Sequence, residues 1–268
     1  MIRKKINRIV SVAGIVSIIS GFSIPTMAKA NQLTIDNQPE LSDSVSAFVT
    51  NTEEKIGDFT YQLLENENGE RYAKIVSCNN KELTNINIES VVTASDGRNY
   101  DIKYIGKQVF KDMTNLSKIK IGKLITDIYD SAFSGCSKLE SVDFSNAIAL
   151  NYIGNGAFKN CEWLTEIQLP KSLTKIGQDS FSGCSRLENI SLNEGLISID
   201  INAFYGTRFT KLTLPKSITS MGSVYGAALN GSSVEEITLS SETTTIPEGL
   251  LNCKTSKISK LIVPNTVT

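Results

Sequence analysis

Apolar residues recur along most of the chain in a frame of about 23 residues, a period typical of stacked repeats. The stretches Ile153 to Pro170 and Ile176 to Leu192 show it best, because they match position by position. Each starts with Ile-Gly, continues through Ala/Ser-Phe and Cys, and ends in an apolar-x-x-apolar-x-apolar run. The copies open at Ile105, Ile128, Ile153, Ile176, Ile199, Met221 and Ile246. Seven copies in one frame predict a stacked repeat protein.

The apolar run at the end of each copy predicts a β-strand. In the run Leu164-x-x-Ile167-x-Leu169, the last two apolar residues alternate with polar ones, which is the period that a strand requires. One copy cannot bury its apolar face alone, so we expect successive strands to stack into a parallel sheet around a continuous core. A second short run, such as Leu173-x-x-Ile176, predicts extended structure on another side of the coil. The Gly-x-x-Ala/Ser-Phe segment between them is predicted to be a helical turn.

Two side-chain columns should lie inside this core. The repeat phenylalanines are expected to stack as an internal column: Phe110, Phe133, Phe158, Phe181 and Phe204. Four cysteines occupy equivalent positions, three residues after the repeat Phe or its counterpart: Cys136, Cys161, Cys184 and Cys253. We interpret them as a structural ladder of buried thiols that donate to backbone carbonyls. A disulfide between neighbouring coils stays open as an alternative, whereas a linear ladder does not converge on a metal ion.

The residues before the repeats differ in character. Residues 1–30 have a positive start, an uncharged apolar stretch and small residues at Ala28 and Ala30, which predicts a secretory signal peptide. An uncleaved membrane anchor is the alternative, although a spanning helix usually needs about 20 apolar residues. Residues 31–56 are predicted to be a flexible polar leader. Residues 57–104 contain a hairpin signal at Asn68-Gly69 and predict an N-terminal capping repeat.

Residues 105–268 carry the repeats, and the last copy stops in mid-frame at Thr268. We therefore expect the chain to be part of a longer protein or a truncated product. No segment after the predicted signal peptide is apolar enough to span a membrane.

Charge and composition exclude several functions. All five charges of residues 1–30 are basic, so the exported chain would have 27 − 5 = 22 basic and 28 acidic residues, a net charge of −6. This balance lacks the basic stripe that nucleic-acid binding needs. The chain has no histidine, which removes Ser-His-Asp and Cys-His catalysis and His-ligated zinc. We expect no cofactor and no metal.

The motif Ile-Gly-x-x-Ala-Phe-x-x-Cys-x-x-Leu-x-x-Ile-x-Leu-Pro resembles the BspA-like class of leucine-rich repeats over residues 57–268. The resemblance implies a bacterial extracellular or surface protein of a family mostly linked to adhesion. The fold class predicted is a leucine-rich-repeat solenoid, a β-rich α/β right-handed superhelix. Its parallel sheet should contain about seven repeats, each of roughly 22 to 25 residues, behind an N-terminal β-hairpin cap.

The outward positions of the predicted strands are the candidate ligand-binding residues. They share one face of the sheet: Lys118, Lys120, Ser141, Asp143, Glu166, Gln168, Asn189, Ser191, Lys211, Thr213, Glu236, Thr238, Lys260 and Ile262. Solenoids usually bind through such extended surfaces. The alternative interpretation is a solvated face with cross-strand pairs, such as Lys120 with Asp143 or Lys211 with Glu236. This row contains no aromatic residue, although aromatics are typical of tight protein interfaces.

These features predict a secreted or cell-surface protein-binding and adhesion module whose partner is an extracellular protein. The alternative is a structural spacer that projects a downstream domain. We do not expect an enzyme, because the acidic residues follow the repeat and the sequence implies no concave pocket.

Overall fold

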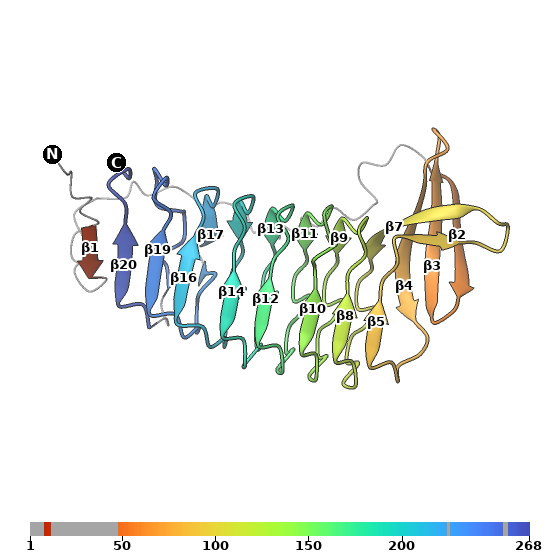
Figure 1. Cartoon of the computed structure of the whole chain (residues 1–268), viewed down its shortest axis with the longest axis horizontal. Coiled ribbons are helices and arrows are strands. Elements are labelled where there is room, and N and C mark those ends of the chain that lie inside the picture. Colours follow the sequence, from red (N-terminus) through yellow and green to blue (C-terminus); the bar gives the residue numbers. More distant parts are fainter. Residues whose placement is uncertain (1–7, 12–47, 224–225, 254–256) are drawn as a thin grey trace, which may run out of the picture.

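A computed structural model of the chain describes residues 8–11, 48–223, 226–253 and 257–268. These residues form an elongated solenoid whose coils stack side by side, with a group of antiparallel strands at one end (Figure 1). The predicted repeat solenoid is therefore confirmed. Of the predicted signal peptide and leader, residues 1–7 and 12–47 lie outside the described residues.

One face of the solenoid consists of the strands predicted from the apolar-x-x-apolar-x-apolar runs. In chain order they are β5 (Asn85–Asn87), β8 (Lys118–Lys120), β10 (Ser141–Asp143), β12 (Glu166–Gln168), β14 (Asn189–Ser191), β16 (Lys211–Leu214), β19 (Glu236–Leu239) and β20 (Lys260–Val263). We call this surface the strand face. Its hydrogen-bonded pairing divides it into three parallel sheets, β5–β8–β10, β12–β14 and β16–β19–β20, and β1 (Arg8–Ser11) pairs antiparallel with β20.

A second face is formed by shorter strands from the other side of each coil. They are β7 (Asn99–Ile105), β9 (Asp127–Ile128), β11 (Tyr152–Ile153), β13 (Lys175–Ile176), β15 (Ser198–Ile199) and β17 (Ser220–Ser223), with β18 (Gly226–Ala227) antiparallel to β17. The first six pair parallel in chain order. This confirms the extended structure predicted at the second apolar run of each copy.

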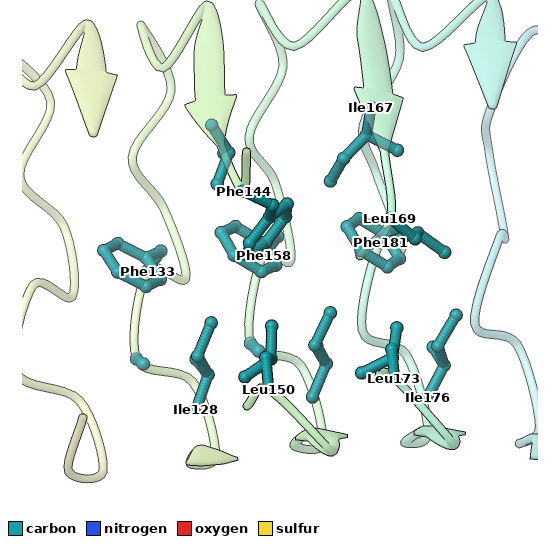
Figure 2. Packing of buried hydrophobic residues seen from close by; sticks show 14 of the residues in the cluster. Ile128, Phe133, Phe144, Leu150, Phe158, Ile167, Leu169, Leu173, Ile176 and Phe181 are labelled. Carbon is teal, nitrogen blue, oxygen red and sulfur yellow. The ribbon is translucent and has the colours of Figure 1, made fainter. Parts of the chain in front are cut away.

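The core lies between the two faces. The phenylalanine column predicted from the sequence is present: Phe110, Phe133, Phe158, Phe181 and Phe204 are buried, and neighbouring rings stack with centroids 4.9 to 5.8 Å apart. Figure 2 shows three of these rings in a row, with aliphatic side chains of the second face on one side and of the strand face on the other. The same coil position thus repeats the same contact along the solenoid axis.

The Phe-bearing segment differs from the prediction, because it forms consecutive turns and the described residues contain no helix. Alternate backbone N–H groups bond to the next coil, and those between them bond to the residue three positions back, so none bonds four positions back as in an α-helix. Phe133 N–H donates to Ala157 O and Phe158 N–H donates to Ser180 O, both at 2.8 Å. The bonds between coils compete with those that an α-helix would need. The expected α/β character is therefore not confirmed, since the described residues form strands and turns.

A backbone with positive φ ends each of these turns, just before the cysteine position. Gly135 and Gly183 have φ of 77° and 76°, and Asn160 has a φ of 60° at the equivalent place. Glycine and asparagine are the residues that adopt this conformation at least cost. The small residue before each Cys is thus required by the turn.

The N-terminal end of the solenoid is antiparallel. β3 (Phe59–Asn66) and β4 (Arg71–Cys78) form the hairpin predicted around Asn68-Gly69, and β6 (Val91–Thr93) pairs antiparallel with β7. β2 (Phe48–Ile56) pairs antiparallel with β3. The predicted flexible leader, 31–56, therefore extended too far, since its last nine residues form this edge strand. Pairing of its backbone with β3, and not an apolar pattern of its own, holds β2 in place.

The last repeat opening was also placed wrongly. Ile246 was predicted to open the last copy, but it is 41% exposed and belongs to no strand. The bridge to Ser220 comes instead from Glu248, and Met221 N–H donates to Glu248 O. In the predicted frame the counterpart of Ser220 was Thr245, so the chain reaches the second face three residues after the predicted point.

Candidate functional site

Side chains of the predicted binding row lie on the strand face, in register. Lys118 lies opposite Ser141 and Lys120 opposite Asp143; Glu166 lies opposite Asn189, Gln168 opposite Ser191 and Lys211 opposite Glu236. Most of these side chains are exposed, while Asp143 and Glu236 are half-buried. The structure brings them together in three groups, because β10 does not pair with β12 and β14 does not pair with β16 within the described sheets.

Two acidic members of this row have polar or charged neighbours. The Ser145 side chain and the Ser145 N–H, which donates to Asp143 Oδ1 at 2.8 Å, lower the pKa of Asp143, and the charge of Lys120 acts in the same direction. Asp143 is therefore ionised at neutral pH. Glu236 forms its ion pair with Lys260, whose Nζ lies 3.0 Å from Oε2, although Lys211 is directly opposite on the other side. Such partly exposed pairs contribute little stability.

An open groove crosses the strand face at β10, β12 and β14. It has a volume of about 910 Å³ and is lined by residues 140–145, 147–148, 165–172 and 189–191. The lining includes the predicted residues Asp143, Glu166, Gln168 and Asn189, whereas Lys118, Lys120, Lys211 and Glu236 lie outside it. The sequence implied no concave pocket, because the interruption of pairing between β10 and β12 depends on how the coils stack. That interruption has no direct signal in the repeat motif.

The cysteine ladder lies in the interior, away from the groove. Cys136, Cys161 and Cys184 are buried, and their Sγ atoms donate to the carbonyls of Phe110, Phe133 and Phe158 in the preceding coil at 3.0 to 3.3 Å. Cys253 is half-buried, and its Sγ donates to Leu250 O. Cys78, Cys136, Cys161 and Cys184 are free thiols.

Burial makes these thiols chemically inert. It raises the pKa of Cys136 and of Cys184 to about 12 and raises that of Cys161 well above its ordinary value. Since the thiolate is the nucleophile and the metal ligand, the ladder is structural. Among the described residues, no group of three or more Cys, Asp or Glu side chains is arranged to hold a metal ion.

A cluster of tyrosines and lysines on the second face was not predicted. Tyr104 stacks on Tyr129 with centroids 6.0 Å apart, and the ammonium groups of Lys103 and Lys175 lie 3.7 and 5.6 Å from the rings of Tyr72 and Tyr152. The signal in the sequence was a tyrosine next to the repeat Ile in three successive copies. The tyrosine rings and lysine ammonium groups contact one another along the sheet, so the cluster stabilises the second face.

Asp127 lies in the same cluster, opposite Tyr104 on one side and Tyr152 on the other. Burial raises the pKa of its carboxyl group, and the Thr126 hydroxyl, which donates to Oδ2 at 2.6 Å, opposes that change. A carboxylate between two tyrosines is a local cost to stability at neutral pH.

Comparison with known proteins identifies the repeat. The BspA type leucine rich repeat region matches in six copies, over residues 46–150, 74–177 and 151–268. Curated proteins give no match. No helix of the described residues is long and apolar enough to cross a membrane.

Three solved structures are similar in fold. The pneumococcal vaccine antigen PcpA has a TM-score of 0.58 and 19% identity, over 81% of this chain and 71% of that one. A leucine rich cell surface protein of Faecalibacterium prausnitzii A2-165 has a TM-score of 0.51 and 21% identity, over 74% and 65%. The leucine rich repeat protein of T. pallidum has a TM-score of 0.50 and 21% identity, over 80% and 84%. This chain thus spans less than two thirds of the F. prausnitzii protein, and such low identities show the fold alone.

Proposed function

Because the chain belongs to the family of BspA-type leucine-rich repeat proteins, we propose that it is exported and binds a partner protein at the cell surface through its strand face. The repeat family supports a binding role, and one of the structures with the same fold is described as a cell surface protein. The predicted signal peptide supports export. Adhesion to an extracellular protein of a host, the matrix or a neighbouring cell is the corresponding cellular role.

The groove across β10, β12 and β14 is the observation that carries this proposal. It is open along the strand face and includes six of the fourteen outward residues predicted as ligand contacts. Sites for small molecules are usually enclosed and mostly apolar, whereas this groove is open and is lined by both polar and apolar side chains of neighbouring strands. An open groove of mixed polarity on a rigid repeat surface suits a protein segment better.

Binding through this face needs no catalytic group, and we propose no enzymatic activity. The carboxylates of the groove, Glu140, Asp143 and Glu166, come from two adjacent repeats and have no histidine to work with anywhere in the chain. A spacer role remains the alternative, since a rigid stack of coils can also project another domain. In that role the strand face would be a solvated surface, so the two roles differ in one measurable property.

Surface plasmon resonance of the exported protein against a panel of purified matrix, plasma and cell-surface proteins tests the proposal. We expect saturable binding to at least one protein of the panel. Binding should weaken when Glu166→Lys reverses a charge in the groove of the strand face, and persist in Lys111→Glu, an exposed lysine in the turn segment outside that face. A panel with no saturable binder, or equal effects of the two substitutions, would favour the spacer.

A further inference from the structure

The loop after β10 carries an exposed isoleucine where the neighbouring coils carry charges. Ile148 lies two residues before the core residue Leu150, and its side chain is 64% exposed. The equivalent residues, two before the matching core position of the other coils, are Lys123, Lys171, Glu194 and Lys216, all exposed. Burying an exposed isoleucine against a partner is favourable, and this isoleucine interrupts a column of charged residues.

The loop that carries Ile148 is longer than its counterparts and well held. Nine positions separate Phe144 from Ile153, against seven between Leu169 and Ile176, so two residues are inserted here. The Ser172 hydroxyl of the next coil donates to Ala147 O and to Leu150 O at 3.3 and 2.7 Å. The inserted loop therefore presents Ile148 at a fixed place in the groove lining.

An exposed tryptophan lies close to the groove in sequence, outside its lining. Trp163 lies just before β12, two residues before Thr165 of the lining, and is 40% exposed. The equivalent residues of other coils are Asn115, Lys138, Arg186 and Arg208. The guanidinium of Arg186 lies 4.8 Å from the Trp163 ring centroid and holds the ring in place. Tryptophan and arginine are the residues most enriched at energetically important contacts.

The groove near Ile148 and Trp163 is acidic. Its charged lining residues are Glu140, Asp143 and Glu166 against Lys171 alone. The strands on either side of the groove carry lysines instead: Lys118 and Lys120 on β8, and Lys211 on β16. Opposite charges attract a partner and like charges exclude one, so the centre of this groove selects for a positive side chain.

We propose that the groove binds an extended segment of a partner protein with a lysine or arginine at its centre and an apolar side chain toward each end. The basic group would lie among Glu140, Asp143 and Glu166, with the apolar groups against Ile148 and Trp163. An extended chain rises about 3.3 Å per residue. A segment that runs along β12 from Trp163 to the loop level of Ile148 is therefore about six to eight residues long. This proposal rests on the proposed function and names the chemistry of its partner.

Trp163 is the only tryptophan of the chain, so its fluorescence reports binding at the proposed site. The probe is a synthetic eight-residue peptide with leucine near each end, lysine at the centre and serine or threonine elsewhere. We expect a saturable change in Trp163 emission that weakens as salt is raised, because exposed charges are screened. Peptides with glutamate at the centre, or with serine for both leucines, should bind at least about tenfold more weakly.

Matched substitutions inside and outside the groove show whether the peptide binds there. Ile148→Ser and Glu140→Lys should each weaken peptide binding by about tenfold. The controls are Ile197→Ser, an isoleucine 49% exposed outside the groove, and Glu235→Lys, which occupies the repeat position of Glu140 on another coil. Both controls should stay within about twofold of the original chain. An unchanged far-UV circular dichroism spectrum shows that each variant is folded.

The outcomes separate this inference from the function on which it rests. If the protein panel yields a binder but the lysine peptide gives no saturable signal up to about 1 mM, the partner chemistry proposed here is wrong and the binding role stands. Equal effects of the groove and control substitutions on peptide binding would also overturn the inference. If neither the panel nor the peptide binds, both proposals fail.

Discussion

Replacing Phe158 with alanine perturbs the central column of the core. The side chain is fully buried, and its ring stacks on Phe133 and Phe181 with centroids 5.0 and 5.4 Å apart and planes within 4° of parallel. It also meets Phe144 edge to face at 6.3 Å. Truncation removes these contacts from both neighbouring coils at once, so the cavity lies in the middle of the stack.

We expect Phe158→Ala to lower the free energy of unfolding by about 4 kcal/mol. Buried Phe→Ala substitutions cost about 3 to 5 kcal/mol, and each aromatic pair contributes about 0.5 to 1.5 kcal/mol of that. The backbone of this coil is bonded to its neighbours on both sides, through Phe133 N–H to Ala157 O and Phe158 N–H to Ser180 O, so collapse of the cavity is restricted. The estimate therefore lies above the lower end of the range.

Urea unfolding followed by circular dichroism and by Trp163 fluorescence measures this loss. With a slope of about 2 kcal/mol per molar urea, the midpoint should fall by about 2 M. Phe158→Leu keeps most of the volume and should cost less than about 2 kcal/mol, and Ile197→Ala, at an exposed position, should change stability by less than about 0.5 kcal/mol. A loss below about 1 kcal/mol for Phe158→Ala would refute the stacked column.

Three further outcomes are expected. Cys253 should react first with a thiol reagent at pH 8, while Cys136 and Cys184 react only on unfolding, because burial raises the pKa of each to about 12; equal rates for all thiols in the folded protein would contradict their burial. Asp127→Asn should stabilise the protein at neutral pH, because burial raises the pKa of this carboxyl group. The Asp127 carboxyl group binds its proton more tightly in the folded state than in the unfolded state, so the original chain should lose stability as pH rises above about 4. Urea titrations at pH 4 and pH 7 measure the stability of the variant relative to the original chain. If that advantage is no larger at pH 7 than at pH 4, the prediction is wrong. Export should produce a new N-terminus at Asn31, which N-terminal sequencing of the exported protein checks; an intact Met1 would favour the membrane anchor.

The repeat frame was predictable because each position of the motif has one physical task in every coil. Ile167 and Leu169 alternate with exposed residues and therefore define a strand, and Phe158 recurs at the same depth in the core. The register of the outward residues followed from the same frame, so Lys120 faces Asp143 and Lys211 faces Glu236 as expected.

The features that the motif did not predict depend on contacts between coils. The Phe-bearing turn is not helical, because its N–H groups bond to the next coil. β2 has an ordinary polar sequence and is held by pairing with β3. A repeat motif describes the residues of one coil, so it does not predict the hydrogen bonds between coils.

The groove was missed although part of its signal was present. The step from Ile128 to Ile153 is two residues longer than the step from Ile153 to Ile176, which shows an insertion, and the exposed Ile148 breaks a column of charges. Ile148 and Trp163 differ from the residues at the equivalent positions of the other repeats, and this difference is visible in the sequence. The loss of pairing between β10 and β12 had no such signal.

Amide hydrogen exchange of the exported protein, with and without the partner found in the binding panel, tests the central claim most directly. If the strand face binds through its groove, the partner should slow exchange in residues 140–148 and 163–172 and leave the second face, from β9 to β13, unchanged. Protection confined to the second face or to the N-terminal antiparallel strands would contradict the account, and so would binding that protects no part of the groove.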